Sequence, residues 1–159
     1  MSASWAVVAT VDEPAPLVAA FVAHHLNEGA REVHLFLDKP DPETVALIRD
    51  MKGCKLTRCN KDHWAAHNNG TRPYLHTRRQ IINANIAYAA CRADWLVHCD
   101  ADWKKSALKD TDFSLAFNEA TRRGQCACSI VVLSRVIEGR GSWPQAVARG
   151  RGVRTHDAR

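Results

Sequence analysis

Two aspartates stand one residue apart, Asp100 and Asp102, directly after the apolar run Trp95–Cys99. In an extended backbone, residues i and i+2 point to the same side, so the two carboxylates would converge. Converging carboxylates bind hard cations such as Mn²⁺ or Mg²⁺, which commonly complete their coordination with substrate phosphates. Such a metal would neutralise charge on a diphosphate leaving group. The alternative is that both aspartates are solvated loop residues.

Acidic residues also follow two other apolar runs. Asp12 and Glu13 come after Ala6–Val11, and Asp38 comes after Val33–Leu37. In open parallel sheets, ligands bind beyond the carboxyl ends of the strands, so these acids should share one rim with Asp100. Acids gathered on one rim repel each other unless a cation or a hydrogen-bonding ligand lies between them. They either cap the helices that follow or bind a nucleobase edge or a ribose.

Basic and polar residues open the helix expected from about His76. Arg78, Arg79 and Gln80 stand in its first turn. Phosphate groups are often bound at helix N-termini, where side chains and backbone N–H groups point at the anion. The alternative is that these residues are a solvated first turn.

Four possible zinc ligands follow one another as Cys54, Cys59, His63 and His67. Each residue type binds Zn²⁺. A conventional zinc finger has about twelve residues between its second Cys and its first His, whereas three residues separate them here. The two cysteines also fit a strand, so the pattern disfavours a zinc site.

Short apolar runs alternate with stretches of helical periodicity through the first hundred residues. Strands are expected at 6–11, 33–37, 54–59 and 95–99, with helices around 17–26, 45–51 and 77–93 between them. Residues 60–76 lose the pattern and are expected to form a loop. Strands separated by single helices pair in parallel through right-handed crossovers. The sequence therefore predicts an α/β fold with a doubly wound, mostly parallel, Rossmann-like sheet.

Five segments together resemble a known family. They are Val8–Glu13, the helix through Ala23-His24-His25, Val33–Asp38, Arg79-Gln80 with Asn83 and Asn85, and Asp94–Asp102. This ordered series resembles the N-terminal, donor-binding half of family 2-like glycosyltransferases with the GT-A fold, and in particular bacterial members. The resemblance covers about residues 5–102.

The resemblance implies a nucleotide-sugar donor, UDP-sugar or another nucleoside diphosphate sugar, an unidentified acceptor and a Mn²⁺ or Mg²⁺ cofactor. By the family pattern, Glu13 and Asp38 would hold the nucleoside, and Arg79 would lie near the diphosphate. Asp100 and Asp102 would form the metal-binding D-x-D motif. Thr10, Asp12 and Asp100 complete the expected donor-binding set. The catalytic base is not assigned, although Glu119 is a carboxylate in the region where one is needed.

The chain departs from the family after residue 102. Trp103-Lys104-Lys105 stands where the family has an acidic residue and an apolar pair. We therefore divide the chain into a nucleotide-sugar-binding half, 1–102, and a divergent segment, 103–159. Only a helix at 114–122 is suggested in that segment, and the rest is expected to be an irregular tail on an incomplete fold. The hypothesis is that the reading frame was lost near residue 103, or that the gene is a degraded fragment, so that activity is doubtful.

The positive charge is concentrated near the C-terminus. The chain of 159 residues has a net charge of +5, and after Ile130 six arginines face two acidic residues. This arginine-rich stretch, from about residue 134, allows nucleic-acid binding as one alternative function, which the acidic rim disfavours. A non-catalytic nucleotide-binding module is the other alternative. No apolar run reaches the roughly 18–20 residues of a membrane span, and neither an export signal nor a need for disulfides is seen, which favours a cytoplasmic protein.

Overall fold

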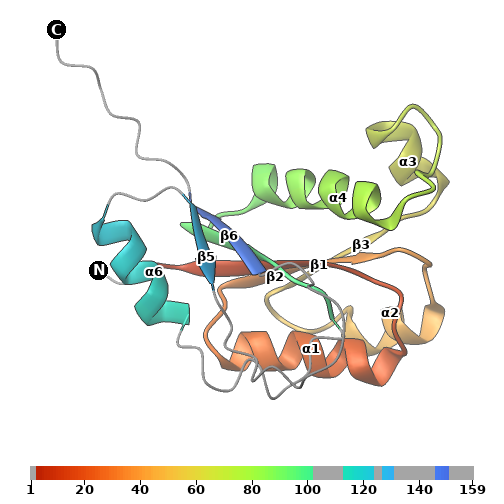
Figure 1. Ribbon diagram of the computed structural model, residues 1–159. Helices are drawn as coiled ribbons and strands as arrows, with labels where there is room; N and C mark the ends of the chain where they lie inside the picture. The colour runs from red at the N-terminus through yellow and green to blue at the C-terminus, as the bar shows by residue number, and fades with distance from the viewer. Residues whose placement is uncertain (1–2, 102–112, 124–126, 131–145, 151–159) are drawn as a thin grey trace, which may run out of the picture.

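A computed structural model describes residues 3–101, 113–123, 127–130 and 146–150. Six strands form one sheet in the order β3-β2-β1-β4-β6-β5 (Figure 1). The strands are β1 (Trp5–Val11), β2 (Glu32–Leu37), β3 (Cys54–Arg58), β4 (Trp95–His98), β5 (Ala127–Ile130) and β6 (Ala146–Gly150). The helices are α1 (Ala15–Asn27), α2 (Pro42–Ile48), α3 (Lys61–His67), α4 (His76–Ala90) and α6 (Phe113–Arg122).

The first four strands are parallel, as the alternation of strands and helices predicts. β1 pairs with β2 and β4, and β2 pairs with β3. Helices α1 and α2 cover one face of this part of the sheet, and α3 and α4 cover the other (Figure 1). The predicted α/β fold with a parallel, Rossmann-like sheet is therefore confirmed at this level.

The central strand β1 is buried along its whole length. Its side chains alternate between two apolar clusters: Val7 and Ala9 pack on the α1 side, and Ala6 and Val8 pack on the α4 side. Each large aliphatic side chain buried in this way contributes about 1.5–3 kcal/mol relative to an exposed one. A continuous run of apolar residues, rather than an alternating one, is what a strand covered on both faces needs.

The acidic residues before α1 and α2 make different contacts. Asp41 caps α2, because its carboxylate accepts hydrogen bonds from the backbone N–H of Thr44, at 2.8 Å, and from the Thr44 hydroxyl. Helix α1 has Pro14 at its N-cap and no side-chain cap. Of the two alternatives for Asp12 and Glu13, capping of α1 is therefore wrong, and both carboxylates are left for other contacts.

The segment expected to be a loop contains a helix, α3. The Asn60 side chain accepts a hydrogen bond from the backbone N–H of His63 at 3.0 Å and so starts the helix. Only His63 and Trp64 are buried within its seven residues. Two neighbouring buried positions in a polar sequence produce no apolar periodicity, which is why the sequence favours a loop here.

The described part of the C-terminal segment joins the sheet. β6 pairs antiparallel with β4, and β5 pairs antiparallel with β6. The prediction of an irregular tail is wrong for these residues, whereas the prediction of a mostly parallel sheet is correct. Arg149 lies in β6, while the other five arginines after Ile130 lie outside the described residues.

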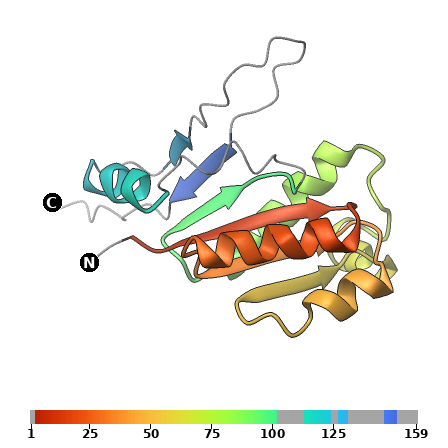
Figure 2. The ribbon, with the colours of Figure 1, turned by 90° about the horizontal axis from the view of Figure 1, so that it is seen from below.

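Helix α6 packs at the amino end of the sheet. The Phe117 ring is fully buried and stacks on Trp95, with ring centroids 5.2 Å apart. Figure 2 shows α6 beside the start of β1. The Asn118 side chain accepts a hydrogen bond from the backbone N–H of Ala3 at 2.6 Å, and the Trp95 indole donates to the Thr121 hydroxyl at 2.9 Å. Residues on both sides of the predicted boundary at 102 and 103 thus share one core.

Candidate functional site

Three residues of α4 contact the carboxyl ends of three different strands. Arg79 pairs with Asp38, which follows β2. Gln80 donates a hydrogen bond to Asp100, which follows β4. Asn83 donates to Thr10, near the end of β1. The predicted rim therefore exists, and the first turns of α4 lie across it.

The contact between Asp38 and Arg79 is a buried ion pair. Their side chains are 3% and 10% exposed, and Nε of Arg79 lies 2.9 Å from Oδ1 of Asp38. Arg72 adds a second guanidinium group, with Nη2 donating to Oδ2 of Asp38 at 2.8 Å. A carboxylate this buried is tolerated because two cations and their hydrogen bonds offset its lost hydration.

Arg79 also organises the chain that leads into α4. Its Nη1 donates to the backbone carbonyls of Pro73 and Tyr74, at 2.8 and 2.7 Å. Helix α4 has no side-chain N-cap, so Arg79 connects the preceding loop to the sheet in place of a cap. Since Arg79 is already bonded to three oxygens, the guanidinium groups more open to a ligand at this rim are those of Arg72 and Arg78, which are both exposed.

Asn83 is the centre of a buried polar network. Its amide nitrogen donates to the Thr10 hydroxyl at 3.0 Å and to the Cys59 sulfur at 3.6 Å, and its oxygen lies 3.0 Å from Nε2 of His63. Burial lowers the pKa of His63, although the Asn83 contact opposes that shift. This network keeps Thr10, a predicted donor-binding residue, 97% buried and bonded within the protein.

Asn83 belongs to the segments that carry the resemblance, but the sequence alone assigns it no role. Its spacing of four residues from Arg79 places both on the same face of α4. That spacing is the signal by which the partnership could have been found.

Asp100 is half-buried, lies two residues after the end of β4, and is one of the two predicted metal ligands. Its Oδ1 accepts a hydrogen bond from the Gln80 side chain at 2.5 Å. The neighbouring His98 ring is mostly buried, which lowers the pKa of His98, while Asp100 partly opposes the shift. Asp102 lies outside the described residues, so the structure places one half of the D-x-D motif at the rim.

Asp12 and Glu13 border a hollow at the ends of β1 and β2. The hollow has a volume of about 380 Å³, near the lower end of the roughly 300–1,000 Å³ typical of small-molecule sites. Its lining is mainly residues from the starts of α1 and α2 and the strand ends, with Asp12, Glu13, Asp41, Glu43 and Lys39 as its charged members. Asp12 is paired with Lys39, and Glu13 accepts a hydrogen bond from the Asp12 backbone N–H at 2.8 Å.

The four spaced Cys and His residues do not assemble into a metal site. Burial raises the pKa of Cys54 to about 11 and that of Cys59 to about 12, which keeps both thiols protonated. Within the described residues, the one group of three metal-binding side chains is Glu32, His34 and Cys91.

Glu119 lies far from the rim. It forms ion pairs with Arg122, the last residue of α6, and with Arg123, which follows that helix. Since α6 packs against Trp5 and Trp95, the first residues of β1 and β4, Glu119 belongs to the opposite end of the strands. This position gives it no access to a ligand bound at the carboxyl ends.

No protein-family model matches this sequence, and no curated protein matches it. Among the described residues, none of the helices combines the length and apolar character needed to cross a bilayer. The rim offers carboxylates for hydroxyl or amide hydrogen atoms, exposed guanidinium groups for anions, and one carboxylate for a cation.

Proposed function

We propose that this chain binds a nucleoside diphosphate sugar at the carboxyl ends of β1, β2 and β4 and belongs to a glycosyltransferase with a GT-A-like fold. The observation that carries the proposal is the set of three contacts from α4 to three strand ends, through Arg79, Gln80 and Asn83. These contacts hold acidic and basic groups on one rim, where open α/β sheets bind ligands. The acceptor is unidentified.

The nucleoside fits the hollow beside Asp12 and Glu13. A ribose or a nucleobase edge presents O–H and N–H donors, and carboxylates are the acceptors that such donors need. Lys39 offsets part of the negative charge there through its pair with Asp12. Glu13 is the better candidate for direct contact, because its charged neighbour Asp12 already has a cationic partner.

The diphosphate is assigned to Arg72 and Arg78. Both guanidinium groups are exposed, and Arg78 stands in the first turn of α4, where the helix dipole also favours an anion. Asp38 and Arg79 are then positioning residues: their buried pair holds Arg72 and the start of α4 in place.

The divalent cation is assigned to Asp100 and Asp102. Asp100 fits a cation, because among the described residues its carboxylate accepts a side-chain hydrogen bond from Gln80 alone, and the residue is partly exposed just after β4. Mn²⁺ or Mg²⁺ bound there would neutralise charge on the departing nucleoside diphosphate. Gln80 holds the Asp100 carboxylate in one orientation and so prepares it for this role.

The test is calorimetric titration of the chain with UDP, with and without Mn²⁺. We expect metal-dependent binding that is lost when Asp100→Ala and Asp102→Ala are combined. Asp50→Ala is the matched control, since Asp50 is an exposed aspartate on a different part of the surface. A folded chain that binds neither UDP nor other nucleoside diphosphates would overturn the proposal.

A second assay separates an enzyme from a binding module. If metal-dependent binding is found, UDP-sugars are incubated with the chain and release of UDP is measured, in water and with a mixture of candidate acceptors. Release that requires Asp100 supports a transferase. Binding without release supports the non-catalytic nucleotide-binding module.

A further inference from the structure

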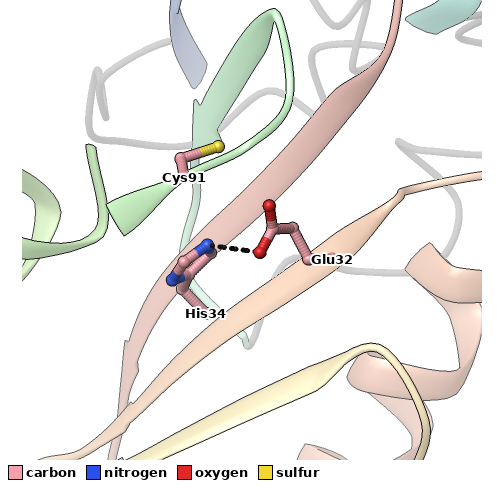
Figure 3. A group of neighbouring side chains, drawn as sticks. All are labelled: Glu32, His34 and Cys91. Carbon is pink, nitrogen blue, oxygen red and sulfur yellow. Dashed lines mark ion pairs between the residues drawn. The ribbon is translucent and has the colours of Figure 1, made fainter. Parts of the chain in front are cut away.

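Three side chains of metal-binding type lie together at the amino end of the strands, away from the rim. Glu32 and His34 are the first and third residues of β2, so they point to the same side of the sheet. Cys91 follows the last residue of α4. Figure 3 shows the three side chains gathered around one small space. Their ligand atoms all lie within 4.8 Å of one another.

All three residues are buried, with exposures of 5% for Glu32, 4% for His34 and 2% for Cys91. Nε2 of His34 lies 3.3 Å from Oε2 of Glu32, but among the described residues this nitrogen has no partner with hydrogen-bond geometry. A buried imidazole nitrogen in that state is costly unless something else satisfies it. A metal ion would do so through the nitrogen lone pair.

The Glu32 carboxylate has two further partners beside His34. The Arg92 backbone N–H donates to Oε1 at 2.7 Å, and Lys55 pairs with Oε2. These contacts fix the position of the carboxylate next to the imidazole of His34.

We propose that Glu32, His34 and Cys91 form a zinc site. Zn²⁺ binds carboxylate oxygen, imidazole nitrogen and thiolate sulfur, whereas Mn²⁺ and Mg²⁺ prefer oxygen ligands. With Zn–ligand bonds of about 2.0–2.3 Å, ligand atoms in a tetrahedral site are roughly 3–4 Å apart. The observed ligand atoms, all within 4.8 Å of one another, would therefore have to approach one another by no more than about 1–2 Å. Three protein ligands leave a fourth position for water.

Binding requires the present contacts of two ligands to be exchanged. The Cys91 thiol, which donates to the Ala93 carbonyl at 3.9 Å, gives up that contact and loses its proton to solvent as the Zn–S bond forms, and no electron transfer is involved. Lys55 must also give up the Glu32 oxygen that the metal takes, and its half-exposed side chain can move into solvent. Zinc would then join the start of β2 to the connection between α4 and β4.

The site is independent of the proposed donor site. Glu32 and Asp38 lie at opposite ends of β2, and a β-strand rises about 3.3 Å per residue, so roughly 20 Å separates the two. Zinc binding can therefore be tested separately from UDP binding, and a negative result for one leaves the other proposal unaffected. We expect zinc to raise the midpoint of thermal unfolding, because it binds only the folded arrangement of the three residues.

The experiment is competition for Zn²⁺ between the reduced, metal-free chain and a chromophoric chelator, together with the absorption spectrum of the Co²⁺ complex. We expect one strongly bound Zn²⁺ and a thiolate-to-cobalt charge-transfer band. Loss of a ligand's outer hydrogen-bond partner typically weakens metal binding by about 10–100-fold, so Cys91→Ala should weaken it by at least about 100-fold. Cys54→Ala, in the adjacent strand β3, is the matched control and should bind as the unmodified chain does.

Two further variants, with one control, keep the test decisive if Cys91→Ala does not fold. His34→Gln should weaken zinc binding, while the control His67→Gln, on the exposed side of α3, should not. Lys55→Met should bind zinc severalfold more tightly, because the competing ammonium group is removed. Equal affinity in the unmodified chain and in folded His34→Gln, or zinc held only by other cysteines, would overturn the proposal.

Discussion

The two ends of the parallel strands use their side chains differently. At the amino end, Phe117 and the group of Glu32, His34 and Cys91 are buried, and α6 packs over the first residues of β1 and β4. At the carboxyl end, Asp12 and Arg72 remain exposed and Asp100 is half-buried. Contacts at the amino end therefore hold the chain together, while the carboxyl end keeps polar groups open to a ligand.

The acidic side chains at the carboxyl end also differ from one another in exposure to solvent. Asp38 and Asp12 both follow strands and both pair with cations, but their side chains are 3% and 42% exposed. An ion pair removed from water is costly to break, because the remaining charge is left without hydration. An exposed pair contributes little, because water replaces either partner. Position on the rim alone thus does not decide whether an acid is structural or available to a ligand.

The largest effect is expected at the amino end, from Phe117→Ala. Its fully buried ring stacks on Trp95, and removal of a buried aromatic ring typically costs about 3–5 kcal/mol of unfolding free energy. Urea unfolding followed by tryptophan fluorescence measures this cost. Leu47→Ala, at a half-exposed position on α2, is the control and should cost less than about 1 kcal/mol. Equal costs would show that α6 does not pack as described, and would favour the hypothesis of a lost reading frame.

Asp38→Asn tests whether the buried Asp38–Arg79 pair makes the carboxyl end contribute as much to the unfolding free energy as Phe117 does at the amino end. The substitution keeps the shape of the side chain but leaves Arg79 and Arg72 without a counter-charge. We expect a loss of about 3–5 kcal/mol, as for other buried pairs broken at one partner. Asp50→Asn, which breaks an exposed pair with Arg49, should change stability by less than about 1 kcal/mol. A similar small change for Asp38 would mean that the rim is not anchored through this residue.

The buried histidine of α1 should make the chain sensitive to acid. Burial, with a smaller effect from His24, lowers the pKa of His25 to about 4. Between about pH 6.5 and 4 the unfolded chain therefore binds more protons than the folded one, so stability falls as the pH is lowered. The loss from this residue is expected to approach roughly 3 kcal/mol by pH 4.

His25→Gln should flatten the dependence of unfolding free energy on pH, whereas His67→Gln, at an exposed position, should not. His34, His63 and His98 also have lowered pKa values, so some slope is expected to persist. Identical slopes in the His25 variant and the unmodified chain would contradict the assignment.

The smallest effect is expected from Lys39→Met. It removes the ion pair with Asp12 at a position where the lysine side chain is 72% exposed. Unfolding free energy should fall by no more than about 1 kcal/mol, and the difference should shrink further in high salt. A large, salt-independent loss would place Asp12 with the structural acids and weaken its assignment to the ligand.

Most elements could be predicted from local patterns. The run Ala6–Val11 and the periodic apolar residues of α1 predict a strand and a helix because burial on one or two faces repeats at short spacing. Helix α3 could not be predicted this way, since its two buried residues depend on packing from the rest of the fold. The pairing of β6 with β4 was also missed, because an edge strand accepts a partner from any distance along the chain.

The sequence by itself determined the strand ends, and so which acids share a rim, because alternation of strands and helices sets parallel pairing. Only the tertiary structure decided the partners of those acids. Asp38 and Arg79 are separated by 41 residues, and Thr10 and Asn83 by 73. The crossing of α4 over the strand ends brings them together, and the burial that results makes Asp38 structural while Asp12 and Asp100 stay accessible. The group of Glu32, His34 and Cys91 has the same origin, since a contact between β2 and the end of α4 leaves no periodic signal in the chain.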